Sequence, residues 1–167
     1  QPVTPQIQNL TQINTTYNEL NYGTTYHWRV VAKNICNQMV NGPVFAFSIR
    51  DLPDIIIDTV ISPPNAFSGE EIEIEWQTRN MGPGTTESQV WSDAVYLSTD
   101  ATLNVSFDTY LGAVQNLTSL DSGIVYTNTG TFMVPNGYTG NYYVFVYADR
   151  WNNLLENQNN NNWDRTP

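Results

Sequence analysis

Residues 71–76, within a run that extends to Thr78, alternate strictly between acidic and apolar side chains, and this alternation constrains the fold more than any other feature of the chain. A period of two places successive side chains on opposite faces, as in a strand with one buried face, whereas a helix has a period of 3.6 residues. The rest of the sequence shows no helical periodicity, so the pattern indicates an all-β chain. The apolar members are Ile72, Ile74 and Trp76, and the acidic members are Glu71, Glu73 and Glu75.

Other short alternating or apolar runs are separated by turns that contain Pro, Gly or Asn. Many short strands with a turn signal at every break are typical of an immunoglobulin-like antiparallel β-sandwich. The sequence therefore predicts this fold for the larger part of the chain. The runs are residues 26–32, 43–49, 55–61, 90–98, 110–114, 124–134 and 142–148.

A break in the pattern at Leu52-Pro53 divides the chain into two expected domains. The few strands before Pro53 bury too little apolar surface to be stable alone. We therefore expect residues 1–51 to be the second half of a sandwich whose first half lies elsewhere. Residues 52–167 are expected to form the second domain.

The charge balance is acidic, with 16 Asp and Glu against 6 Lys and Arg. A negative field repels phosphate backbones, which argues against nucleic acid and anionic membranes as partners. The chain has no apolar run long enough for a transmembrane helix and no signal-peptide pattern, so no direct membrane insertion is expected. Cys36, the only cysteine, is expected to be buried as a small hydrophobic residue.

Catalytic chemistry is not expected. The only histidine, His27, lies mid-strand beside Trp28 and faces outward by its alternation. A general base needs positioned partners, and one histidine with one cysteine gives no triad. The chain is therefore predicted not to be an enzyme.

Two loops are rich in oxygen donors, and calcium binds six to eight oxygens from such loops. The first candidate site follows the strand at 142–148, and the second follows the strand at 90–98. The alternative is that these side chains only cap turns. The candidate calcium ligands are Asp149, Asn152 and Glu156 in the first loop, and Asp100, Asn104 and Asp108 in the second.

Aromatic residues form a second candidate surface. Three of them alternate with the apolar residues of the strand at 142–148 and so share the face opposite the expected core. Such a platform stacks on sugars or on a neighbouring module, unless an adjoining strand covers it. The candidate residues are Tyr143, Phe145 and Tyr147, flanked by Trp151 and Trp163.

The first part of the chain resembles the second half of a fibronectin type III domain. The resemblance lies in LNYGTTYHWRVVAKN at residues 20–34 and PVFAFS at residues 43–48. It implies that Tyr26 folds over a corner and hydrogen-bonds a nearby backbone group. The earlier strands of such a domain are missing.

From Leu52 onward the chain resembles CARDB, the cell-adhesion-related domain found in bacteria. The matching segments are LPDIII at 52–57, SGEEIEIEW at 68–76, RNMGPG at 79–84, WSDAVYLSTD at 91–100, GNYYV at 140–144 and AD at 148–149, with Glu156, Asn161 and Asn162 at the end. The family's last strand should follow Asn162, so it is expected to be missing.

These resemblances imply a non-catalytic structural or adhesive segment of a large secreted or cell-surface bacterial protein, acting as a spacer and interaction module. Its expected partners are neighbouring domains of the same polypeptide and surface glycans or proteins. One alternative is a carbohydrate-binding or accessory module of a secreted hydrolase. Another is a subunit of a secretion or gliding-motility complex. Calcium is the one cofactor that the sequence suggests.

Overall fold

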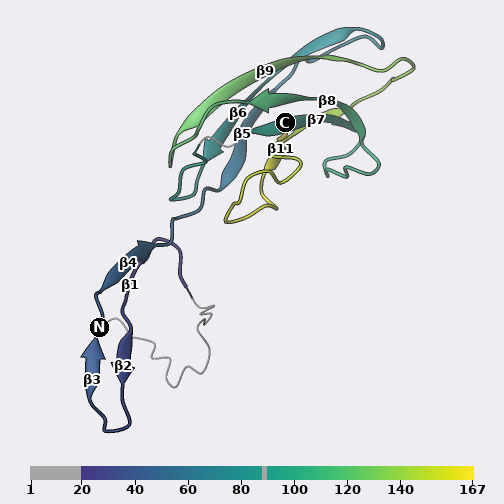
Figure 1. Cartoon of the computed structure of the whole chain (residues 1–167). Coiled ribbons are helices and arrows are strands. Elements are labelled where there is room, and N and C mark those ends of the chain that lie inside the picture. The colour runs from purple at the N-terminus through teal and green to yellow at the C-terminus, as the bar shows by residue number, and fades with distance from the viewer. Residues whose placement is uncertain (1–19, 88–89) are drawn as a thin grey trace. The chain divides into compact units, whose positions relative to one another are not determined.

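The computed structural model describes residues 20–87 and 90–167. The chain divides into two compact units, Gln1–Arg50 and Asp51–Pro167. The described residues form strands, turns and loops (Figure 1). None of them belongs to an apolar helix that could cross a membrane.

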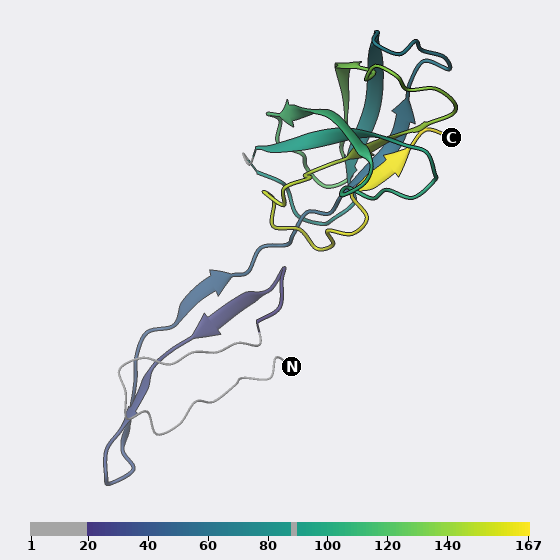
Figure 2. The same cartoon turned by 90° about the vertical axis from the view of Figure 1, so that its right-hand side faces the viewer.

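The larger unit is an immunoglobulin-like sandwich of two antiparallel sheets, as the sequence predicts (Figure 2). One sheet has the order β5-β6-β9, and the other has the order β11-β10-β7-β8. The strands of the first sheet are β5 (Ile55–Ile61), β6 (Glu71–Asn80) and β9 (Val125–Met133). Those of the second are β7 (Trp91–Ser98), β8 (Thr109–Asn116), β10 (Tyr143–Tyr147) and β11 (Trp163–Arg165).

The main hydrophobic core lies between these two sheets. On β6 the apolar residues of the alternating run are buried, while Glu71 and Glu73 are exposed. These buried apolar residues of β6 pack against apolar residues of β7 and β10. The alternation in the sequence therefore determines which face of β6 enters the core. Because Trp76 is fully buried, its replacement by alanine should lower the free energy of unfolding by about 3–5 kcal/mol. Core residues from the two sheets include Ile72, Ile74, Trp76, Trp91, Val95, Val144 and Val146.

A last strand is present, although the sequence suggests that it is missing. Trp163–Arg165 forms β11, which pairs antiparallel with β10 in the register Phe145↔Arg165 and Tyr147↔Trp163. Three residues are too few to give a period-two pattern, so a strand of this length leaves no signal in the sequence.

The outer strand β5 carries a bulge between Ile57 and Thr59. The shift turns Thr59 outward and returns Val60 to the core. Asp58, within the bulge, pairs with Arg79 of β6, and its Oδ2 atom lies 2.6 Å from Nε and 2.5 Å from Nη2.

The smaller unit contains two pairs of short strands. β1 (Thr25–Trp28) pairs with β4 (Phe45–Ser48), and β2 (Val31–Lys33) pairs with β3 (Met39–Asn41). The run predicted at 26–32 is therefore interrupted after Trp28. Cys36 is exposed in the turn between β2 and β3, so the expectation that it is buried is wrong.

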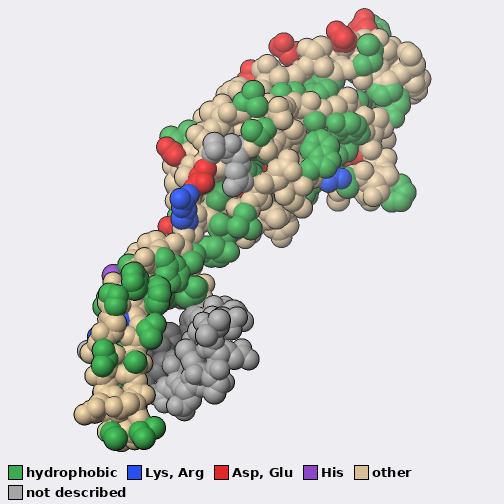
Figure 3. Space-filling model, viewed as in Figure 1, with side chains coloured by type: hydrophobic (Ala, Val, Ile, Leu, Met, Phe, Trp, Pro, Cys, Tyr) green, Lys and Arg blue, Asp and Glu red, His purple; other side chains and the backbone are tan. Residues whose placement is uncertain are grey.

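One face of the β1–β4 pair is aromatic. Trp28 stacks on Phe45 with ring centroids 5.0 Å apart, and Tyr26 stacks on Phe47 at 5.8 Å. Trp28 and Phe45 remain 49% and 50% exposed. Figure 3 shows hydrophobic side chains over the surface of this unit. The hydroxyl of Tyr26 accepts a hydrogen bond of 2.8 Å from the backbone N–H of Asn21, the kind of bond that its sequence context implies.

Candidate functional site

Asn80, at the end of β6, is fully buried, and its side chain makes four hydrogen bonds. Its Oδ1 atom accepts hydrogen bonds from the backbone N–H groups of Asp54 and Gly82, both at 3.0 Å. Its Nδ2 atom donates to the carbonyl oxygens of Gly84 at 2.6 Å and Leu120 at 3.0 Å. One amide therefore connects the segment before β5, the turn after β6 and the loop between β8 and β9.

A second set of contacts joins the loop after β10 to the start of β5. Glu156 Oε2 accepts a 2.7 Å hydrogen bond from the backbone N–H of Ile55, 101 residues away. Its Oε1 atom accepts from Asn162 Nδ2, also at 2.7 Å. The backbone N–H of Asn157 donates to the carbonyl of Pro53 at 2.9 Å. We call this group, with Asp54 and Asn161, the clasp.

Burial dominates the electrostatics of the clasp. It raises the pKa of Glu156 to about 7, since a charged carboxylate loses its hydration there, and the neighbouring Asp149 and Asp54 carboxylates raise it further. Hydrogen bonds from Ile55 and Asn162 act in the opposite direction. Burial also raises the pKa of Asp149, against hydrogen bonds from two backbone N–H groups.

The first predicted calcium loop is only partly assembled as a set of ligands. Both carboxylate oxygens of Asp149 accept backbone hydrogen bonds of 2.8 Å, from Asn153 and Leu154, so this side chain caps the turn. Asn152 is exposed and has a positive φ of 52° within that turn. Glu156 lies close enough to Asp149 for their charges to interact.

In the second predicted calcium loop, the side-chain oxygens accept hydrogen bonds from backbone N–H groups of the same loop. The backbone N–H of Thr102 donates to Asp100 Oδ1 at 2.8 Å, and that of Asn104 donates to Asp108 Oδ2 at 2.5 Å. Asn104 Oδ1 in turn accepts from the N–H of Ser106 at 3.2 Å. Within residues 20–87 and 90–167, no three His, Cys, Asp or Glu side chains gather where a metal ion could be held.

The predicted aromatic platform is largely covered. Phe145 is fully buried, so its assignment to an exposed surface is wrong. It packs with Ala94 and Tyr96 in a second cluster, under Leu103 of the loop after β7 and under Trp163, whose ring centroid lies 5.7 Å away. The long β7–β8 loop thus covers this face, which the period of β10 alone does not reveal.

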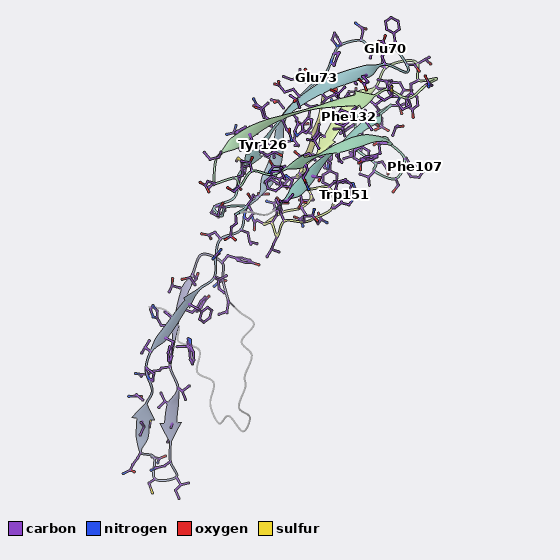
Figure 4. All side chains as sticks on the ribbon, turned by 45° about the horizontal axis from the view of Figure 1, so that its top comes forward. Glu70, Glu73, Phe107, Tyr126, Phe132 and Trp151 are labelled. Atoms are coloured by element: carbon purple, nitrogen blue, oxygen red, sulfur yellow. The ribbon has the colours of Figure 1, made fainter. Side chains whose placement is uncertain are left out.

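The remaining aromatic residues are more accessible. Arg165 lies over the ring of Tyr143, 4.6 Å from its centroid, and Arg150 lies 5.5 Å from that of Tyr147. Trp151 is 52% exposed at the margin of the sandwich (Figure 4). The arrangement leaves Trp151 as the open aromatic surface of this group.

A buried carboxylate in the middle of the core has no counterpart among the predicted sites. Asp93 of β7 is fully buried, and its Oδ2 atom accepts hydrogen bonds from Trp76 Nε1 at 2.9 Å and from the hydroxyl of Tyr126. Burial raises the pKa of Asp93 to about 6, against the hydrogen bonds from these two residues. Period two could have found it, since Asp93 shares the inward face of β7 with Trp91 and Val95.

Two stacked antiparallel sheets, tied through Asn80, Asp93 and the clasp, define the larger unit as an immunoglobulin-like β-sandwich module. A family model described as CARDB matches residues 52–166. The chain therefore belongs to the CARDB family.

A solved CARDB structure shares this fold. A CARDB domain from Pyrococcus furiosus, crystallised in complex with di-metal ions, is 19% identical with a TM-score of 0.50, over 69% of this chain and 90% of that one. A β-glucosidase from Listeria innocua in complex with glucose is 15% identical with a TM-score of 0.40, over 70% of this chain and 16% of that one. No curated protein matches the chain.

Proposed function

We propose that the chain is a non-catalytic structural and adhesive segment of a large secreted or cell-surface bacterial protein. In this role the CARDB sandwich acts as a stiff spacer, and its loops offer contact surface. Membership of an adhesion-related family supports the proposal. The observation that carries it is the anchoring of the segment by which the chain enters the sandwich.

Several distant parts of the fold hold this segment, residues 52–55. The N–H of Asp54 bonds to the Asn80 side chain, and the N–H of Ile55 bonds to Glu156. The carbonyls of Leu52, Pro53 and Asp54 accept hydrogen bonds from Gly84, Asn157 and Met81. Tension applied at Asp51 therefore falls on several bonds at once. Extension of the segment has to break these hydrogen bonds together, and each contributes about 0.5–1.5 kcal/mol net.

The smaller unit supports a spacer of several modules. We propose that residues 1–51 are the second half of a fibronectin type III-like sandwich, completed by other strands of the same polypeptide. A two-stranded ribbon with an exposed aromatic face is marginal alone, because it buries little apolar surface. The stacked pairs Trp28–Phe45 and Tyr26–Phe47 supply the face that a second sheet would cover.

Single-molecule pulling of the whole chain from its two ends tests the spacer role. We expect one cooperative unfolding event for the sandwich at a force that Asn80→Ala lowers clearly, since this change leaves two backbone N–H groups without their acceptor. Asn159→Ala, in an exposed part of the last loop, is the matched control and should leave the force unchanged. Extension without a resolvable force peak would contradict the proposal.

A second candidate is an accessory module that binds carbohydrate, and the exposure of Trp151 favours it. Exposed aromatic rings stack on sugars, and an exposed tryptophan beside Arg150 fits that use. A glycan array probed with the whole chain and with Trp151→Ala separates the two candidates. Binding to one sugar class that disappears in the variant would favour the accessory module over the spacer.

A further inference from the structure

We propose that the clasp is a calcium site, in which side-chain oxygens of Asp54, Glu156, Asn161 and Asn162 hold the ion between the last loop and the first strand of the sandwich. The site does not depend on the proposed spacer role. It differs from both calcium loops that the sequence predicts, because it combines residues more than 100 positions apart.

The four side chains form a closed ring of contacts. Asn161 Nδ2 donates to Asp54 Oδ1 at 3.0 Å, and Asn162 Nδ2 donates to Glu156 Oε1 at 2.7 Å. The ring closes through the backbone, since Glu156 Oε2 accepts from Ile55, the residue after Asp54. Two carboxylates and two amides are thus held side by side, on segments fixed by the sandwich.

Two amide oxygens of this ring have no hydrogen-bond partner within the part of the chain that the structure describes. They are Oδ1 of Asn161 and Oδ1 of Asn162, and both atoms are buried. Asn162 is fully buried, and the amide that carries its orphan oxygen is the one that donates to Glu156. A buried acceptor without a partner costs about 1–3 kcal/mol. Both orphan atoms are acceptors, so what they lack is a donor or a cation.

The charge of the ring favours a cation. Asp54 and Glu156 are 8% and 7% exposed, and Glu156 interacts unfavourably with the Asp54 and Asp149 charges. The donors that bond to Asp54, Asp149 and Glu156 are backbone N–H groups and asparagine amides, all neutral. A bound cation would satisfy the amide oxygens and offset the carboxylate charges together.

Calcium is the cation that fits these donors. It takes six to eight oxygens from carboxylates, amide carbonyls, backbone and water in variable geometry, whereas magnesium demands a near-ideal octahedron and keeps most of its waters. Two carboxylates and two amide oxygens form such a set when each amide turns its oxygen toward the carboxylate that its NH2 group contacts. Asp149 lies outside it, because its oxygens cap a turn.

A proton on Glu156 is the competing explanation. Burial raises the pKa of this group to about 7, and a protonated carboxyl group could donate to an asparagine oxygen. The test therefore has to be carried out at a pH where the proton is released, and it has to compare calcium with acid.

The experiment measures thermal unfolding and isothermal titration calorimetry of the whole chain at pH 8, after removal of metal by a chelator. We expect the melting temperature to rise progressively with added CaCl₂, because an ion that binds only the folded state stabilises it in proportion to ln(1 + [Ca²⁺]/Kd). MgCl₂ should give a clearly smaller rise. Glu156→Gln keeps the side chain's size but removes its charge, and it should abolish the rise.

Glu73→Gln is the matched control, since Glu73 is exposed on β6, and it should keep the full rise. If Glu156→Gln does not fold, Asp54→Asn provides the second variant. It should need at least tenfold more calcium than the wild type to reach the same rise in melting temperature. The proposal is overturned by a melting temperature that does not change up to about 10 mM CaCl₂, the weak end of calcium modules being about 1 mM. It is overturned equally by the same rise in the wild type and in a folded clasp variant.

Discussion

Trp76 and Asp93 connect the two sheets of the sandwich through a hydrogen bond of 2.9 Å from the indole N–H to carboxylate Oδ2. Trp76 lies on β6 and Asp93 on β7, and both are fully buried. Tyr126 of β9 donates to the same oxygen, so one carboxylate joins three strands in the middle of an apolar core. Buried polar groups of this kind fix the relative position of the layers they connect.

The stability that Asp93 contributes should depend on pH. Its pKa is about 6 in the folded chain against an ordinary value of 3.8, so the folded state holds the proton more tightly. The contribution is complete below about pH 4 and is lost as the pH rises through 6. Asp93→Asn resembles the protonated form. We expect the difference in free energy of unfolding, variant minus wild type, to increase by about 2–3 kcal/mol from pH 4 to pH 7.5. Urea unfolding at the two pH values measures this, and a difference that does not change with pH would contradict it.

Removal of the Tyr126 hydroxyl should weaken the connection between the sheets. Tyr126→Phe leaves Asp93 with the bond from Trp76, and we expect a loss of about 1–3 kcal/mol in the free energy of unfolding. The loss should be larger at pH 7.5, where Asp93 is ionised and needs the donor more. Tyr110→Phe, on an exposed ring of β8, should cost less than about 0.5 kcal/mol. Denaturant unfolding of the two variants checks the comparison, and equal costs would argue against a buried tie.

The turn after β6 should not tolerate a side chain at Gly82. A Cβ atom there would lie 2.5 Å from the backbone nitrogen of Asp54 and 2.6 Å from the carbonyl oxygen of Leu52. Gly82→Ala should therefore displace the anchored segment and lower the melting temperature by more than about 5 °C, which corresponds to more than about 1 kcal/mol in a domain of this size. Gly137→Ala is the control, since a Cβ atom at Gly137 meets nothing within 4 Å and only its positive φ of 86° opposes the change. A smaller loss at Gly82 than at Gly137 would show that the turn can move.

Phe145 should behave as a core residue and not as a binding surface. Phe145→Ala opens a cavity beneath Trp163 and Leu103, and we expect a loss of about 3–5 kcal/mol. Phe107 is 87% exposed at the edge of the sandwich (Figure 4), so Phe107→Ala should be nearly neutral. Differential scanning calorimetry compares the two. Near-neutral behaviour of both variants would restore the platform that the sequence suggests.

The alternation of the sequence predicts the sandwich and also which face of β6 enters its core. The same count, continued past Trp76, places Thr78 and Asn80 on the inward face, where the structure buries both. A buried asparagine at the end of a strand needs four hydrogen-bond partners, and that requirement could have marked Asn80 as the centre of the turn. Its partners could not be named in advance, because Leu120 and Asp54 are brought to it only by the fold.

The candidate site was less accessible to sequence reasoning. Glu156 is among the candidate calcium ligands that the sequence suggests, but its contact with Ile55 spans 101 residues and leaves no local pattern. Asp149 and Asn152 have the composition of a calcium loop, and the turn uses Asp149 for its own backbone N–H groups. Composition identifies oxygen atoms, whereas hydrogen bonding decides which of them remain available.

The bulge in β5 has a consequence for many copies of this module crowded together. An outer strand with regular unpaired backbone groups would invite the same strand of a neighbouring molecule to pair with it. The irregularity at Ile57 and Thr59, with the Asp58–Arg79 ion pair beside it, interrupts that template. The outer edge of β5 is therefore a poorer template for a strand of another molecule than a regular strand would be.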